Sequence, residues 1–180
     1  MSKKLKILVI RFSSIGDIIL TTPIIRCLKK QLNADIDFLT KSKYRELLLS
    51  NPNISNVFTI SKENKETIKI LNYKEYDYVI DLQNNFRSLK IRLGLSVKSY
   101  AYQKNNIQRY MLIYFGINLL NNHIVDRYFK SVAKLGVYND NKGIDYFFRK
   151  DPKLAFNTNQ DYISWCIGGT YEQKKLSFNQ

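Results

Sequence analysis

The chain has 180 residues, which suits one domain with a short extension. Its hydrophobic fraction of 44% and aromatic fraction of 13% are typical of a globular protein and exclude an intrinsically disordered chain. The 29 Lys and Arg residues outnumber 15 Asp and Glu residues, which gives a formal net charge of +14. Such a surface attracts nucleic acid, anionic lipid headgroups or an acidic glycan, although a Lys- and Asn-rich chain can also reflect genome composition.

Cysteine and histidine are too few for a disulfide framework or a histidine-based metal cluster. Cys27 and Cys166 lack metal-ligand spacing, and His123 is the only histidine. This composition predicts a reduced, cytoplasmic setting. No apolar stretch of a secretory signal follows the N-terminal lysines, and the apolar-leaning stretch at 110–120 is too short to span a bilayer.

Short apolar runs alternate with helical patterns along most of the chain. The continuous apolar run at 6–11 is typical of a strand buried on both faces of a parallel sheet. Further strands are expected at 35–40, 57–60, 78–82, 97–102 and 162–167. Helices are expected up to residue 32 and near 43–49, 63–71, 86–93, 107–115 and 123–135. Strands that alternate with helices predict right-handed crossovers, and therefore an α/β, Rossmann-like fold with helices on both faces of a parallel sheet.

Three local patterns sharpen this prediction. Thr22-Pro23 either starts the first helix or kinks a helix that begins earlier. Phe86, Leu89 and Leu93 mark one face of the helix that follows the fourth strand. The polar stretch at 139–159 is typical of a linker, because it contains Pro152 and lacks helical or strand periodicity.

Polar and basic residues follow each expected strand. The carboxyl ends of parallel strands share one edge of the sheet, which is where ligands bind in doubly wound folds. The sequence therefore predicts a basic rim with two carboxylates among its cations. Its members are Arg11, Ser13, Ser14, Gly16, Asp17, Lys41, Lys43, Arg45, Asp81, Gln83, Asn84, Asn85, Arg87, Lys104, Asn105 and Arg109.

Several familiar motifs are absent from this rim. Neither the dinucleotide fingerprint G-x-G-x-x-G nor a P-loop is present. Asp35-Ile36-Asp37 has the form of a metal-binding D-x-D, but its place at a strand entrance argues against metal. Ser13 and Ser14 lack the G-x-S-x-G context of a hydrolase nucleophile. Asp17 has two interpretations from position alone, a helix N-cap or first-turn acid and a functional carboxylate.

Four segments carry a family resemblance. ILVIRFSSIGDIILTTP at 7–23 has a strand, a basic residue, S-x-G-D, an apolar stretch and a proline, and YVIDLQNNFRS at 78–88 has an apolar strand that ends in D-x-Q. Together with the segments at 123–128 and 168–176, they resemble glycosyltransferase family 9, the ADP-heptose:lipopolysaccharide heptosyltransferases. The fourth segment departs from the family, because Leu176-Ser177 stands where the family has Trp-Pro or a similar pair.

The resemblance implies a GT-B fold, in which two Rossmann-like domains enclose a cleft. The N-terminal domain would take the acceptor, and the C-terminal domain would take the nucleotide sugar. Residues 1–158 are then the acceptor-binding domain. Residues 159–180 are the linker and the start of a truncated nucleotide-sugar-binding domain, so the isolated chain is expected to be inactive.

The resemblance also implies roles for particular residues. Asp17 is the candidate general base of an inverting, metal-independent transfer of heptose or a related sugar to the lipopolysaccharide inner core. A carboxylate suits this role, because a sugar hydroxyl must lose its proton to become a good nucleophile. Lys174 and Thr170 are expected to bind the donor diphosphate, whose leaving charge a lysine stabilises. The expected acceptor-binding residues are Ser13, Ser14, Gly16, Gln83, Asn84, Arg87 and Arg109.

The expected partners follow from these roles. They are a nucleotide-sugar donor, with ADP-heptose as the leading case, the anionic lipopolysaccharide core, and peripherally the inner membrane surface. The helix at 107–115 is either a core helix or one that lies on the bilayer. No cofactor and no nucleic acid are expected, since nucleic-acid-binding signatures are absent. The alternative function is a non-catalytic anion-binding module for anionic lipid, glycan or nucleic acid on the same scaffold.

Overall fold

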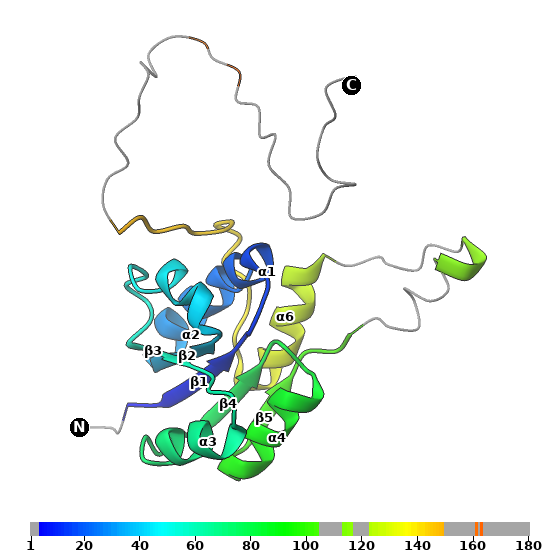
Figure 1. Cartoon of the computed structure of the whole chain (residues 1–180). Coiled ribbons are helices and arrows are strands. Elements are labelled where there is room, and N and C mark those ends of the chain that lie inside the picture. The colour runs from blue at the N-terminus through cyan, green and yellow to red at the C-terminus, as the bar shows by residue number, and fades with distance from the viewer. Residues whose placement is uncertain (1–3, 105–112, 117–122, 150–160, 162, 164–180) are drawn as a thin grey trace. The chain divides into compact units, whose positions relative to one another are not determined.

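The computed structural model describes residues 4–104, 113–116, 123–149, 161 and 163 (Figure 1). The chain divides into two compact units, Met1–Arg149 and Lys150–Gln180. All of the described helices and strands belong to the first unit. The strand expected at 162–167 and most of the helix expected at 107–115 lie outside the described residues, apart from a short helical turn at 113–115.

Five parallel strands form one sheet in the order β3-β2-β1-β4-β5. The strands are β1 (Lys6–Ile10), β2 (Asp35–Thr40), β3 (Asn56–Thr59), β4 (Tyr78–Asp81) and β5 (Ser99–Ala101). The chain moves outward from β1 to β3 and then returns to β4 on the other side of β1. The carboxyl ends of β1 and β4 therefore border the topological switch point, where open α/β sheets bind ligands.

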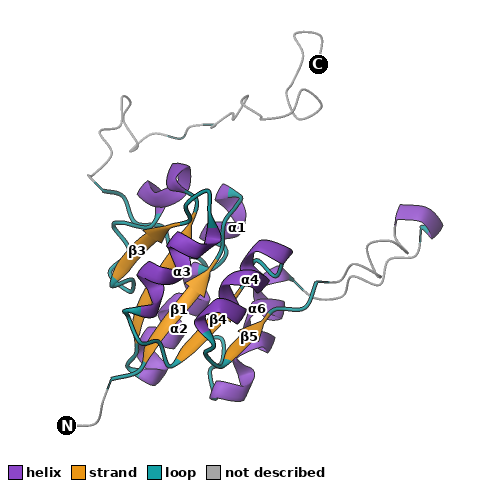
Figure 2. Cartoon of the chain, turned by 60° about the horizontal axis from the view of Figure 1, so that its bottom comes forward, coloured by secondary structure: helices purple, strands orange, loops and turns teal. Residues whose placement is uncertain are grey.

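Helices cover both faces of the sheet, as the sequence predicts (Figure 2). On one face lie α1 (Ile15–Ile19), α2 (Thr22–Leu32) and α6 (Ile124–Val132), followed by the 3-10 helix η2 (Ala133–Leu135). On the other face lie α3 (Asn64–Asn72) and α4 (Phe86–Leu95). The central strand β1 contributes Ile7 and Val9 to the first core layer and Leu8 and Ile10 to the second, so both of its faces are buried.

The helical pattern is interrupted between Ile19 and Thr22, which decides between the two alternatives for Thr22-Pro23. A short helix, α1, ends at Ile19, and a separate helix begins at Thr22 with Pro23 in its first turn, where a missing N–H is tolerated. The helix expected near 43–49 is instead a 3-10 helix, η1 (Ser42–Leu47). The remaining described elements match the expected ranges within about two residues, apart from β5, which is shorter.

The apolar face expected on α4 is exposed to solvent. Ser88, Ile91 and Leu95 point into the core, whereas Phe86, Leu89 and Leu93 lie on the outer side. The spacing of i, i+3 and i+7 identified a real helical face, but Ile91 and Leu95 form an opposite apolar face that packs on the sheet. An apolar stripe on the sequence alone does not say which of two faces is buried.

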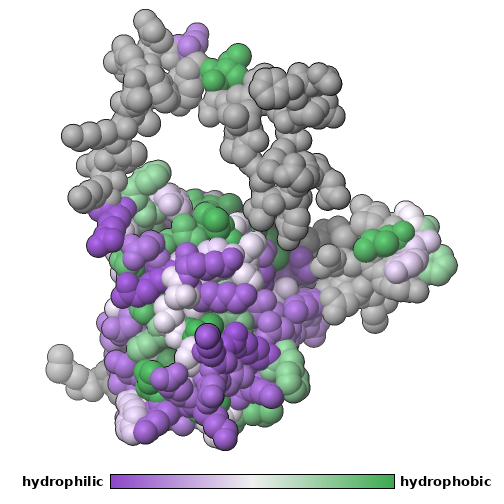
Figure 3. Space-filling view, in the orientation of Figure 1, coloured by the Kyte–Doolittle hydropathy of each residue, from purple (hydrophilic) through white to green (hydrophobic). Residues whose placement is uncertain are grey.

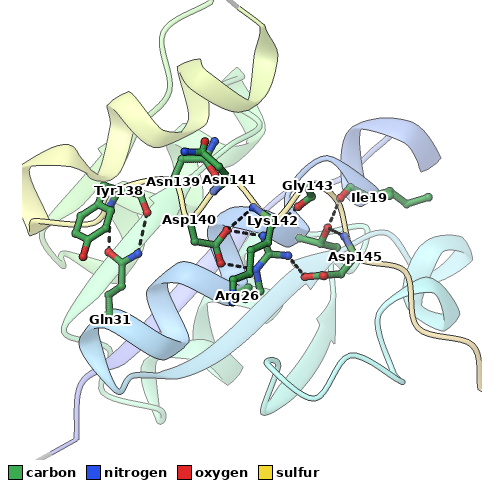
Figure 4. Close-up of polar contacts among 11 residues, drawn as sticks. Ile19, Arg26, Gln31, Tyr138, Asn139, Asp140, Asn141, Lys142, Gly143 and Asp145 are labelled. Atoms are coloured by element: carbon green, nitrogen blue, oxygen red, sulfur yellow. Dashed lines mark hydrogen bonds and ion pairs between the residues drawn. The ribbon is translucent and has the colours of Figure 1, made fainter.

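The segment at 137–149 returns over the first helical layer as an irregular strap. It follows Gly136, whose φ of 74° ends η2, and it is fastened to α2 by side-chain hydrogen bonds (Figure 4). Within the linker expected at 139–159, the described part up to Arg149 is thus an irregular segment that is held against α2. No helix in the described part of the chain is long and apolar enough to cross a membrane.

Candidate active site

An ion pair joins the end of β1 to the helix that follows it. The Arg11 Nη2 and Asp17 Oδ2 atoms are 2.7 Å apart, with the arginine side chain buried and the aspartate partly exposed. Both residues stand at the carboxyl end of the central strand, beside the switch point. The structure thus brings the candidate base and a cation together on the predicted rim.

Asp17 is at the same time a helix-capping residue. Its Oδ2 atom accepts hydrogen bonds of 3.1 Å from the backbone N–H and from the hydroxyl of Ser14, which precedes α1. This is the reciprocal half of a capping box. The two interpretations of Asp17 are therefore compatible: the cap fixes the carboxylate, and the fixed carboxylate faces the rim.

The pKa of Asp17 lies below its usual value. Partial burial pushes the pKa upward, but the Ser14 N–H and the Arg11 guanidinium outweigh that effect. The carboxylate is therefore ionised at neutral pH. The Ser14 N–H, the Ser14 hydroxyl and the Arg11 guanidinium all contact Oδ2 of Asp17. Among the described residues, no hydrogen-bond donor to Oδ1 is found. Oδ1 thus keeps its lone pairs available for a further hydrogen-bond donor.

Arg11 holds the surrounding loops together. Its Nε donates to the carbonyl of Ser13 at 2.8 Å, and its Nη1 donates to the carbonyl of Leu82 beyond β4. Its guanidinium carbon lies 6.0 Å from the centroid of the Tyr128 ring on α6. One side chain thus connects the β1 loop, the β4 loop and α6, which a planar five-donor fork can do and a lysine cannot.

The Tyr128 side chain is fully buried beneath this pair. Its hydroxyl has no hydrogen-bond partner among the described residues, and its ring meets Tyr102 edge to face at 5.1 Å. Burial raises the pKa of the Tyr128 phenol well above its usual value, so it stays neutral. The sequence placed Arg11 on the basic rim and Tyr128 in the family-like segment at 123–128, but it predicted neither the ion pair of Arg11 with Asp17 nor the contact of Arg11 with Tyr128.

The second loop of the rim is fastened by its own carboxylate. Asp81 is fully buried, and its Oδ1 accepts the backbone N–H groups of Gln83 and Asn84 at 3.0 and 2.8 Å. The Gln83 Oε1 atom accepts the N–H of Phe12, and the Asn84 amide donates to the carbonyl of Tyr102. The polar groups of Gln83 and Asn84 thus tie neighbouring loops together, so any contact with an acceptor would add to this structural role.

Arg87 also has protein partners. It donates to the side chain of Asn64 at 3.1 Å and to the carbonyl oxygens of Ser61 and Lys62, which fixes α4 to the β3–α3 loop. Arg87 still lines an open hollow of about 400 Å³ on the rim, together with Lys41, Lys43 and Lys62. Lys41, Lys43 and Arg87 were predicted members of the basic rim, whereas Lys62 was not.

The other predicted site residues fall into two groups. Ser13 and Gly16 lie on the rim in the loop and helix start around Asp17, and a Cβ added to Gly16 would meet no atom within 4 Å, so the space beside Gly16 is open. Arg109, Thr170 and Lys174 lie outside the described residues. Among the described residues, no group of three or more His, Cys, Asp or Glu side chains could hold a metal ion.

No family model matches the chain. Over 159 residues it is 27% identical to lipopolysaccharide heptosyltransferase 1 of Campylobacter coli, covering 84% of this chain and 45% of that protein. Over 139 residues it is 29% identical to lipopolysaccharide heptosyltransferase 3 of Escherichia coli K12, covering 68% and 40%. The chain therefore carries a domain that is similar to lipopolysaccharide heptosyltransferases, and we call it the heptosyltransferase-like domain. It spans less than half the length of these relatives.

Solved structures show the same fold. The crystal structure of a glycosyl transferase of family 9 from Veillonella parvula superposes on the heptosyltransferase-like domain with a TM-score of 0.61 at 22% identity. The superposition covers 81% of this chain and 46% of that one. The predicted Rossmann-like α/β class is thereby confirmed.

Proposed function

We propose that the complete protein transfers a heptose or a related sugar from a nucleotide-sugar donor to the inner core of lipopolysaccharide. In this proposal the heptosyltransferase-like domain binds the acceptor, and Asp17 is the general base. The observation that carries the proposal is an ionised carboxylate at the switch point, fixed by Arg11 and Ser14 and bordered by open space at Gly16. The likeness to two lipopolysaccharide heptosyltransferases supplies the substrate class.

The proposed chemistry is a single displacement with inversion. As the acceptor oxygen forms its bond to the anomeric carbon, the bond from that carbon to the donor diphosphate breaks. The acceptor proton passes to Oδ1 of Asp17, since Oδ2 already accepts from Arg11 and Ser14. General base catalysis of this kind typically contributes about 10²–10⁴-fold. Because the charges are balanced by fixed cations, the transfer is proposed to be independent of metal.

The acceptor's acidic groups are proposed to bind the basic hollow. Lys41, Lys43 and Lys62 line it with Arg87, and a phosphate or carboxylate there would contact several cations at once. Gln83 and Asn84 support the adjoining loop. Arg109, which the family resemblance implies as a further contact, belongs to this proposal as well.

The donor side is proposed to lie beyond this domain. Residues 1–158 would form the acceptor-binding domain, and 159–180 would lead into the domain that binds the nucleotide sugar, with Thr170 and Lys174 at the diphosphate. The support is that the chain spans only 45% and 40% of the two relatives. The enzyme would act on the cytoplasmic side of the inner membrane, at its surface.

The test is sugar transfer from ADP-heptose to a water-soluble, delipidated lipopolysaccharide core. We expect the complete protein to be active and the isolated 180-residue chain to be inactive. Asp17→Asn should lower turnover of the complete protein by about 10²–10⁴-fold without unfolding it. Asp35→Asn is the matched control, because Asp35 pairs with Lys4 at the opposite edge of the sheet. Equal turnover of both variants would return Asp17 to a purely structural cap.

A further inference from the structure

The outer side of α4 is an apolar stripe without a partner in the described part of the chain. Phe86 and Leu93 are 72% and 69% exposed, and Leu89 is exposed between them. The inner side of the same helix already buries Ile91 and Leu95 in the core. Removing large apolar side chains from water is favourable, so this stripe is a feature that the fold of the domain does not explain.

Lysines lie beside the first turn of the stripe. Lys90 lies within it, with its Nζ atom 4.6 Å from the centroid of the Phe86 ring. An open hollow of about 570 Å³ between the first turns of α3 and α4 is lined by Lys62, Lys65, Phe86 and Lys90, with Glu63 as its one acidic residue. In Figure 3, hydrophilic and hydrophobic residues adjoin on the side of the domain that α3 and α4 cover. We call this surface the α4 face: Phe86, Leu89 and Leu93 with Lys62, Lys65 and Lys90.

This combination identifies the chemistry of the partner. The cores of protein interfaces are depleted in lysine. Nucleic acid is bound mainly through its phosphates, which exposed leucines do not contact favourably. Large apolar side chains beside lysines are instead typical of a helix that lies in the headgroup region of an anionic bilayer. There the rings and methyl groups enter the acyl boundary while the ammonium groups meet lipid phosphates.

We propose that the α4 face binds the surface of an anionic membrane. This inference rests on the proposed function, in which the acceptor is a lipid-anchored glycan. Since α4 begins directly after the rim loop that holds Gln83 and Asn84, contact through its first turn brings the rim close to the headgroups. Arg87 fixes this turn to the β3–α3 loop, so the surface is already formed before binding.

The first experiment is sedimentation of the 180-residue chain with vesicles. We expect binding to vesicles of phosphatidylglycerol and phosphatidylethanolamine, weak binding to pure phosphatidylcholine, and loss of binding in 1 M salt. Phe86→Ser with Leu93→Ser should lower the partition coefficient at least about tenfold. Replacing Lys62, Lys65 and Lys90 by glutamine should lower it by a similar factor or more.

The matched control is a pair of exposed side chains on the opposite face of the sheet. Tyr138 and Ile144 are 70% and 52% exposed on the strap that packs on α2, so Tyr138→Ser with Ile144→Ser removes comparable surface there. Thermal unfolding of each variant checks that it is folded. Binding that survives in the control and is lost in the α4 variants supports the proposal.

Three outcomes would overturn the proposal. They are equal losses in the control and the α4 variants, equal binding to neutral vesicles, and a chain that ignores vesicles but forms a dimer that Phe86→Ser breaks. The last outcome would assign the α4 face to a second copy of the chain. Vesicle binding needs neither donor nor turnover, whereas the transfer assay uses a delipidated acceptor. Failure of the membrane surface and failure of the enzymatic proposal are therefore seen separately.

Discussion

Two buried arginines on the same helical side of the sheet form different kinds of ion pair. Arg11 pairs with Oδ2 of the partly exposed Asp17 at the rim, and no described residue donates a hydrogen bond to the other carboxylate oxygen. Arg26, in the middle of α2, is enclosed by Asp140 and Asp145 of the strap (Figure 4). Its Nε and Nη2 atoms grip both oxygens of Asp140 at 2.8 and 2.7 Å, and Nη2 also donates to the carbonyl of Gly143 at 3.0 Å.

The difference between the two pairs lies in what remains for a ligand. The bidentate grip of Arg26 leaves its first aspartate no open oxygen, which is the pattern of a structural clamp. Gln31 and Tyr138 reinforce the clamp by exchanging two hydrogen bonds, and Thr22 accepts the N–H of Asp145. At the rim, by contrast, all three donors to Asp17 use the same oxygen. A comparable ion pair can therefore either fasten a segment or, as we propose for Arg11, hold a base in position.

The largest effect on stability is expected at the clamp. Arg26→Met leaves two carboxylates without their shared cation, and we expect a loss toward the lower end of the roughly 3–5 kcal/mol typical of broken buried pairs. The lower end applies because Asp140 and Asp145 are 19% and 25% exposed and regain some water. Chemical denaturation at pH 7 measures the loss. Arg45→Met is the control, since that exposed arginine only approaches Glu46 at 3.8 Å and should change stability by less than about 1 kcal/mol.

The clamp also predicts a pH dependence with a definite sign. Hydrogen bonds from Arg26 hold the pKa of Asp140 well below its usual range, despite an opposing effect of burial. A depressed pKa contributes stability that is present above the unfolded value near 3.8 and is lost as pH falls through the folded value. The gap in stability between the natural chain and Arg26→Met should thus be constant near neutrality and shrink below about pH 4. A gap that widens on acidification would contradict the clamp.

An intermediate effect is expected at the rim. Arg11→Gln removes the cation beside Asp17 and the donor to Leu82, and displacing a base by even about 1 Å can cost about 10²-fold in turnover. The pKa of Asp17 should rise, because Arg11 is one of the groups that lower it. The acid limb of the kcat/KM profile of the complete protein should then move to higher pH, since the base must be ionised to act. An unmoved limb would mean that Arg11 is only structural.

How far the sequence alone could go follows from the same residues. The run at 6–11 predicted the central strand, because a strand buried on both faces needs no alternation. The alternation of strands and helices predicted the rim, because the carboxyl ends of parallel strands share one edge of the sheet. The grip of Arg26 on Asp140 and Asp145 spans more than 110 positions, and no local pattern encodes such a contact.

The α4 helix and the rim amides mark the same limit. Phe86 and Leu93 were recognisable as a helical face, but only packing shows that Ile91 and Leu95 take the core. Gln83 was recognisable as a rim residue, but its hydrogen bond to the N–H of Phe12 joins two loops 71 positions apart. Sequence periodicity places residues on faces and edges, whereas partner choice depends on the assembled sheet.

The smallest effect is expected beneath the ion pair. The Tyr128 hydroxyl is buried without a partner among the described residues, so Tyr128→Phe should change stability by less than about 1 kcal/mol, in the stabilising direction. Tyr76→Phe is the matched contrast, because the Tyr76 hydroxyl donates to the buried Asp37 at 2.8 Å and its loss should cost about 1–3 kcal/mol. Thermal and chemical unfolding of both variants measures the difference. If Tyr128→Phe also leaves transfer by the complete protein unchanged, the ring alone supports Arg11. A loss of transfer in a stable Tyr128→Phe variant would instead mean that the hydroxyl serves the reaction at Asp17.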